Sequence, residues 1–136
     1  MLDRLFRRKS QPLPLRGAPA IRRQKTYSAQ TGYVYQYFYE GYRPGEHRDA
    51  PGNQHVFQVS SDRKSSFSLG VFLPAAVVES WQKGHGRELT TTEQYAAVKM
   101  ALFEAFDERA DLGASSGAIE VGAVALERHL ATLEID

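Results

Sequence analysis

The fold of this chain is decided by the stretch Gly32-Tyr33-Val34-Tyr35-Gln36-Tyr37-Phe38-Tyr39-Glu40, in which every second residue is a tyrosine. Side chains alternate between the two faces of a β-strand, so an extended chain brings all four tyrosines to one face. Helical spacing would scatter them, and aromatic residues favour strands. The sequence therefore predicts a strand with one continuous aromatic face.

Two further strands are predicted on the C-terminal side of this one. Residues 55–59 and 66–72 are rich in β-branched and aromatic residues. Residues 41–54 contain glycine, proline, aspartate and asparagine, which are turn formers, so we expect a loop there. A polar turn at residues 61–64 favours antiparallel neighbours, and the strands are predicted to form a meander.

Helices are predicted after the strands. One begins with Pro74 and runs to about Lys83, because proline is favoured in the first turn. A longer one runs from Thr90 to Arg109, and Thr90 with Glu93 matches a capping box. Residues 118–136 are ambiguous between strand and helix, and we favour a short strand followed by a helix.

The expected fold class is α+β. We expect a three-stranded or four-stranded antiparallel sheet, packed on one face by two or three helices, with an extended basic N-terminal arm. The sequence predicts a core made of Phe57, Val59, Phe67, Leu69, Val71, Trp81, Leu102 and Phe106.

Charge divides the chain into two parts. Residues 1–29 carry eight basic side chains and one acid, a net charge of +7, whereas the whole chain is only +1, which leaves −6 for residues 30–136. Three prolines bias the first part away from helix. We therefore predict a basic, proline-containing arm at 1–29 and a single α+β domain at 30–136. Such asymmetry points to an anionic partner for the arm, or to the body itself.

The composition excludes several kinds of chemistry for this chain. The chain has no cysteine, which excludes disulfides and thiolate chemistry, and no apolar run long enough to span a bilayer. The start of the chain is basic without a following apolar stretch, so we expect a cytoplasmic protein. No pair among the four histidines has the spacing of metal ligands on one helix, and we expect neither a metal nor a cofactor. These histidines are His47, His55, His85 and His129.

No catalytic motif is recognisable, so an enzyme is only a third alternative, which a deep pocket holding His85 or His47 beside carboxylates would favour. Four acids gather at the end of the longer predicted helix, where they are either a solvated face or a receptor for the basic arm. They are Glu104, Asp107, Glu108 and Asp111.

The leading hypothesis is a small non-enzymatic interaction or accessory protein, which binds a partner protein or a second copy through its basic arm and its aromatic face. The alternative is a protein that binds RNA or single-stranded nucleic acid by arginine contacts and tyrosine stacking. A further alternative is weak contact of residues 1–9 with an anionic membrane surface. At least two tyrosines are expected to be core residues. The predicted partner-binding residues are Arg4, Arg7, Arg8, Lys9, Arg22, Arg23, Lys25, Tyr33, Tyr35, Tyr37 and Tyr39.

Overall fold

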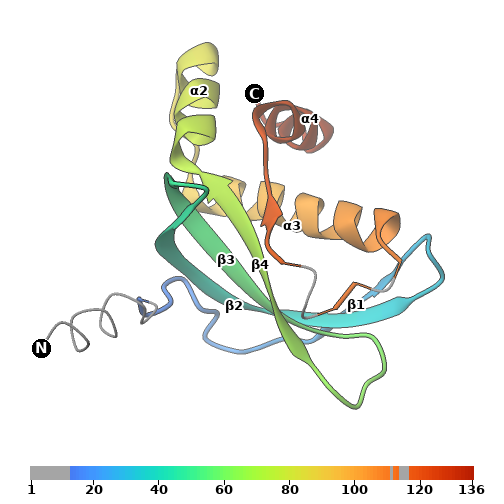
Figure 1. Ribbon diagram of the computed structural model, residues 1–136. Helices are drawn as coiled ribbons and strands as arrows, with labels where there is room; N and C mark the ends of the chain where they lie inside the picture. Colours follow the sequence, from blue (N-terminus) through green and yellow to red (C-terminus); the bar gives the residue numbers. More distant parts are fainter. Residues whose placement is uncertain (1–12, 111, 114–116) are drawn as a thin grey trace, which may run out of the picture.

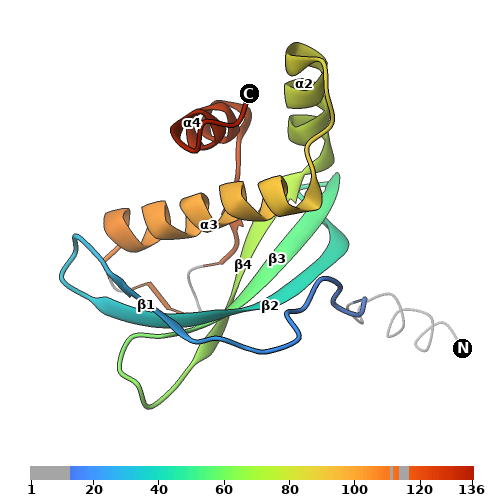
Figure 2. The same ribbon diagram turned by 180° about the vertical axis from the view of Figure 1, so that it is seen from behind.

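A curled sheet wraps around one long helix in the computed structural model (Figure 1), which describes residues 13–110, 112–113 and 117–136. The five strands have the spatial order β1-β2-β3-β4-β5. Helix α3 crosses the concave face of the sheet, while α2 and α4 lie beyond it (Figures 1 and 2). The elements are β1 (Lys25–Ser28), β2 (Val34–His47), β3 (Ala50–Ser60), β4 (Phe67–Pro74), α2 (Ala75–His85), α3 (Thr91–Glu108), β5 (Ile119–Glu120) and α4 (Ala123–Thr132).

The α+β class is confirmed, but the predicted number and direction of the strands need correction. The sheet has five strands rather than three or four, and β5 pairs parallel to β4, with Val71 opposite Ile119. A parallel neighbour requires a long crossover connection, which α2 and α3 supply here. The strand-then-helix expectation for residues 118–136 is confirmed by β5 and α4.

Residues 41–54 form most of a long hairpin instead of the predicted loop. Strand β2 continues to His47, and β3 returns from Ala50. The two residues at the tip have positive φ values, 52° at Arg48 and 64° at Asp49, as a tight type I′ turn requires. Two features of β2 accommodate the glycines and prolines, which are typical of loops. A bulge lies between Tyr39 and Gly41, and β1 pairs only with the first residues of β2, so the rest of β2 forms an edge of the sheet.

Part of the predicted N-terminal arm belongs to the sheet. Strand β1 pairs with β2, so the boundary predicted at residue 29 falls inside the β1–β2 hairpin. Arg16 is also held to β2 by two backbone hydrogen bonds with Tyr42, of 2.7 and 2.8 Å. Between these attachments residues 17–24, called the strap below, run beside β2 (Figure 2).

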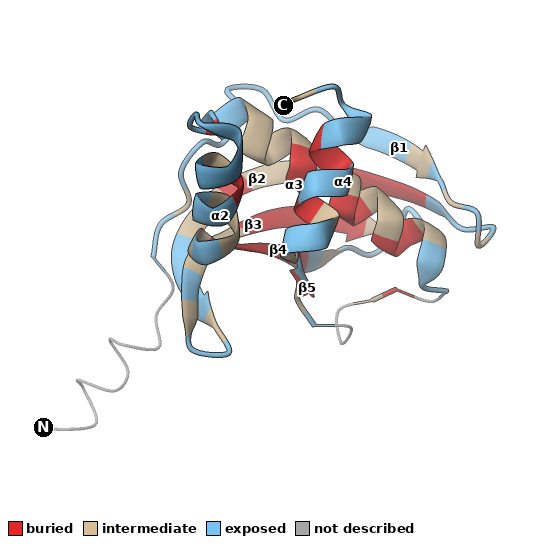
Figure 3. Ribbon diagram, turned by 90° about the horizontal axis from the view of Figure 1, so that it is seen from above, coloured by how far each residue is buried: buried red, intermediate tan, exposed pale blue. Residues whose placement is uncertain are grey.

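The core lies between the concave face of the sheet and the helices (Figure 3). Of the predicted core residues, all are buried except Phe67, which is partly buried at its edge. The ring of Phe106 on α3 stacks on Tyr35 with 4.2 Å between centroids. Helix α4 closes the far side of α3 with the fully buried Leu126 and Leu130.

Two terminal features fix α3 in place. Its N-terminus has the predicted capping box, because Thr90 accepts from the Glu93 amide while the Glu93 side chain accepts from the Thr90 amide. Near its C-terminus the Asp107 carboxylate accepts from the Tyr27 hydroxyl at 2.5 Å and from the Gln30 amide at 3.0 Å. None of the helices in the described part of the chain is long and apolar enough to cross a membrane.

Candidate functional site

A cavity of about 450 Å³ opens between the strap, β2, β3 and the first turns of α3. This volume is in the range of small-ligand sites. The residues that line the cavity are Gly17, Pro19, Ile21, Arg23, Lys25, Tyr37, Phe38, Tyr39, Tyr42, His55, Thr91, Thr92 and Tyr95.

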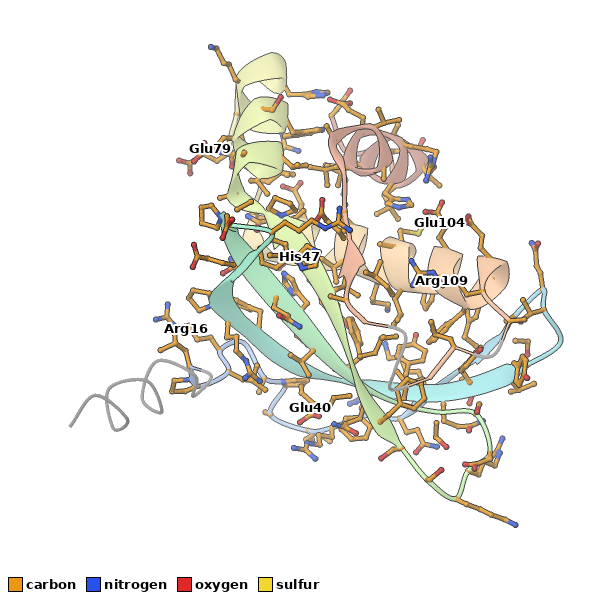
Figure 4. The ribbon with its side chains drawn as sticks, in the orientation of Figure 1. Arg16, Glu40, His47, Glu79, Glu104 and Arg109 are labelled. Carbon is orange, nitrogen blue, oxygen red and sulfur yellow. The ribbon has the colours of Figure 1, made fainter. Side chains whose placement is uncertain are left out.

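The strap forms one wall of the cavity together with Lys25, the first residue of β1. Every second residue from Gly17 to Lys25 lines the cavity. Arg22 lies out of this register. Its guanidinium is 3.7 Å from the Glu40 carboxylate and lies over the Phe38 ring at 5.1 Å. Glu40 is on the side of β2 away from α3 (Figure 4), so Arg22 is neutralised outside the cavity.

The opposite walls are aromatic. Tyr39 on β2 packs against Tyr95 on α3, with 4.5 Å between ring centroids. The ring of Tyr42 lies 5.4 Å from that of His55, which is almost fully buried on β3. These rings present flat apolar surfaces with polar tips, which suits an apolar ligand that also carries hydrogen-bonding groups.

His55 and Tyr39 are joined by a hydrogen bond of 2.9 Å between Nδ1 and the hydroxyl. Burial lowers the pKa of His55 to about 4 and raises the pKa of Tyr39, so both are uncharged at neutral pH. A protonated hydroxyl beside a neutral imidazole fits a bond in which Tyr39 donates to Nδ1. The buried Nε2 atom of His55 finds no hydrogen-bond partner in the described part of the chain.

Three cations gather at one end of the cavity. Arg23 and Lys25 line it, and the Lys99 ammonium lies 5.7 Å from the centroid of Tyr95. Burial lowers the pKa of Lys99, and the positive charge of Lys25 lowers it further. Among the described residues no Asp or Glu lines the cavity, and none forms an ion pair with these three cations. Within the described part of the chain, the positive charge of this end therefore has no ion-pair partner.

The predicted partner-binding residues are distributed over three environments. The ring of Tyr35 is fully buried under α3, and Tyr37 is 5% exposed, which confirms that at least two tyrosines are core residues and removes Tyr35 from any accessible face. Tyr33 is exposed at the end of the hairpin, and Tyr39 lines the cavity. Four of the predicted residues lie outside the described residues, namely Arg4, Arg7, Arg8 and Lys9.

The cavity contains residues that sequence reasoning did not select. His55 is predicted only as the first residue of a strand and as one of four histidines, and Tyr42 falls in the stretch expected to be a loop. Tyr95 falls within the longer predicted helix, and in the structure it is half-buried against the core. One available signal was the alternation of Pro19, Ile21, Arg23 and Lys25, which marks an extended segment with a mixed apolar and basic face.

His47 and His85 each lie close to a surface glutamate, whereas His129 is buried on α4. His85 Nε2 lies 2.8 Å from Glu127, and its ring stacks on Trp81 at 4.1 Å. His47 Nε2 lies 3.3 Å from Glu120. Neither histidine lines the cavity described above. In the described residues no group of three or more His, Asp or Glu is placed to hold a metal ion.

The acids near the end of α3 serve separate purposes. Asp107 accepts hydrogen bonds from the Tyr27 hydroxyl and the Gln30 backbone amide. This acid therefore binds the N-terminal region, but not through a basic side chain. Glu104 points toward α4 (Figure 4), where Arg128 donates to it at 2.5 Å. The fourth predicted acid, Asp111, lies outside the described residues.

Comparison with known proteins finds no matching family model, no similar curated protein and no similar solved structure.

Proposed function

We propose that this chain is a non-enzymatic interaction protein, which binds a partner protein or a second copy of itself over the strap and the cavity behind it. The observation that carries the proposal is the uncompensated positive end of an aromatic cavity, formed by Arg23, Lys25 and Lys99. The proposal keeps the basic N-terminal region as the binding element and replaces the flat tyrosine face with this cavity.

The side chains around the cavity are of the kinds that dominate binding energy at protein interfaces. Tyrosine and arginine are enriched at such interfaces and among the residues whose truncation costs most. The exposed apolar Ile21 lies on the same wall as Arg23. A partner that covers the strap would bury this side chain and supply the missing negative charge.

The alternative of nucleic-acid binding is less well supported. Stacking on unpaired bases needs accessible aromatic rings, and the burial of Tyr35 and Tyr37 removes two of the four tyrosines that this alternative used. The membrane alternative concerns residues 1–9, which lie outside the described residues.

The test compares two charge-reversal variants of the full chain in quantitative affinity enrichment. R23E/K25E changes the cavity, whereas R63E/K64E makes the same charge change in the exposed turn between β3 and β4. The proposal expects a reproducible set of bound proteins that is lost with the first variant and kept with the second. Sedimentation of both variants tests self-association in the same way.

Retention of the same partners and the same oligomeric state by R23E/K25E would refute the proposal. Enrichment of RNA instead of protein, weakening steeply with salt, would support the alternative function.

A further inference from the structure

We infer that the cavity takes an anionic oxygen group, a carboxylate or a phosphate, carried on an aromatic or branched apolar body. The inference rests on the proposed function and specifies which chemical group of the partner enters the site. Three properties of the cavity support it: the arrangement of its charge, the nature of its walls and its size.

The charge is concentrated at one end. Along β2 the cavity passes from Tyr37 to Tyr39 and Tyr42, and Lys25 pairs with Tyr37 at the β1 end of this row. Along α3 it passes from Thr91 to Tyr95, and Lys99 follows one turn later on the same face. Lys25 and Lys99 therefore meet at the same end, close enough for one charge to disfavour the other.

Two ammonium groups held together repel each other, and partial burial strengthens the repulsion because it reduces screening by water. A carboxylate or phosphate placed between them reverses the sign of this interaction and accepts a hydrogen bond from each. Arg23 lies two residues before Lys25 on the cavity side of the strap and supplies a third donor. No carboxylate in the described part of the chain fills this role, and we assign it to the ligand.

The other end of the cavity is uncharged. Tyr39, Tyr42, Tyr95 and the neutral ring of His55 form its walls, and the bond between His55 and Tyr39 fixes two of these rings. A small hydrated anion would leave these rings without a contact, whereas a ring or a branched chain would lie against them. A volume of about 450 Å³ leaves room for such a body beside the anionic group.

The test uses naphthoate and naphthamide, which have the same ring system and differ in charge, with acetate and inorganic phosphate as anions that lack the ring. Heteronuclear NMR of the full chain follows the amides of Tyr39, Tyr42, Thr92 and Tyr95 and the side-chain signals of Lys99. We expect naphthoate to shift these signals and to bind roughly tenfold or more tightly than naphthamide, as a charged hydrogen bond implies. Binding should also raise the pKa of Lys99, because the anion offsets the charge of Lys25.

The variant K25Q should weaken naphthoate binding and leave naphthamide binding unchanged, whereas K64Q, in the exposed turn, should change neither. Lys25 is exposed on the edge strand β1, so its replacement by glutamine leaves the core intact. Naphthyl phosphate in place of naphthoate identifies which of the two anionic groups fits better.

Equal binding of naphthoate and naphthamide would overturn the role of charge, and equal binding of naphthoate and acetate would overturn the role of the aromatic walls. No shift at millimolar naphthoate would overturn the inference as a whole. The partner-enrichment experiment is independent of these results. If the wild type binds naphthoate but R23E/K25E keeps the same partners, the inference stands and the proposed function is refuted. If naphthoate does not bind but R23E/K25E loses the partners, the proposed function stands and the inference is refuted.

Discussion

His55 is a buried base held without a charged partner, and this makes the stability of the protein depend on pH. Its pKa is about 4 in the folded chain and 6.5 in its ordinary state, because burial disfavours the charged imidazolium. Between these two values the unfolded chain binds more protons than the folded chain, so the free energy of unfolding falls as the pH drops from 6.5 to 4. The full effect is about 3 kcal/mol.

Urea unfolding of the wild type and of His55→Gln at a series of pH values measures this effect. The variant should lose most of the decrease between pH 6.5 and 4, whereas His85→Gln, at an exposed pair, should keep it. The lowered pKa of the buried His129 acts in the same direction and remains in both variants. The pKa values of Asp62 and Glu93 are lowered to about 2 from 3.8 and 4.5, so these carboxylates cost stability only as the pH falls below about 4.5, and equally in both variants. An unchanged pH profile in His55→Gln would show that His55 is not the group responsible.

Residue patterns predicted the faces of the central strands but not the cavity. The alternation of tyrosines placed Tyr35 and Tyr37 on one face, and their burial follows from the apolar stripe of α3 that packs on them. Alternation places His55 on the same face as the predicted core residues Phe57 and Val59, so its burial could be predicted from the sequence but its contacts could not. Its environment depends on Tyr39 and Tyr42, whose positions are set by a bulge in β2 that the sequence does not specify.

At the scale of elements, the strap depends on how closely its ends approach β2. Gly41 has a φ of 124°, and a Cβ atom there would lie 2.5 Å from the carbonyl oxygen of Arg16. Gly41→Ala should therefore displace the backbone pairing between Arg16 and Tyr42 and release one end of the strap. We expect a loss of roughly 1–3 kcal/mol from the strained backbone.

Hydrogen exchange measures the release directly, since the Arg16 and Tyr42 amides should lose protection in Gly41→Ala while the β3 and β4 amides keep it. Gly45→Ala is the matched control on the same strand, because a Cβ atom at Gly45 meets nothing within 4 Å and its φ is not positive. Full protection of Arg16 in Gly41→Ala would contradict the role assigned to this glycine.

The predicted elements agree with the structure where local sequence signals determine an element, and they differ where pairing with another strand determines it. The capping box at Thr90 and the left-handed Gly86 that ends α2 are local signals, and both helices begin and end close to the predicted residues. The hairpin at residues 41–54 was read as a loop because its glycines and prolines are typical of loops. Only the register with β3 makes them strand residues, and β5 likewise becomes a strand only through its partner β4.

At the scale of the whole molecule, the N-terminal region is part of the fold. The ring of Tyr27 stacks on Phe103 with 4.5 Å between centroids, and its hydroxyl donates to Asp107. Deletion of residues 1–29 removes β1 and these contacts, so we expect the free energy of unfolding to fall by about 3 kcal/mol or more. Deletion of residues 1–12 removes none of the described contacts and serves as the control for a shortened chain, and chemical unfolding of the two truncated proteins measures the difference that β1 makes.

If both truncated proteins were as stable as the full chain, β1 would contribute nothing to the fold. The comparison also guides the partner experiments, because loss of binding after removal of residues 1–29 would combine the loss of a binding element with damage to the core.

The order in which the chain is made gives the parallel β4–β5 pair a further consequence. A ribosome completes the first four strands before it has added α3, so the concave surface with Tyr35, Phe57 and Leu69 emerges without its cover. Phe106 arrives first, and Ile119 with α4 arrives later still. A nascent chain interrupted within α3 therefore carries an apolar sheet open to water, the kind of surface that chaperones bind and that drives aggregation.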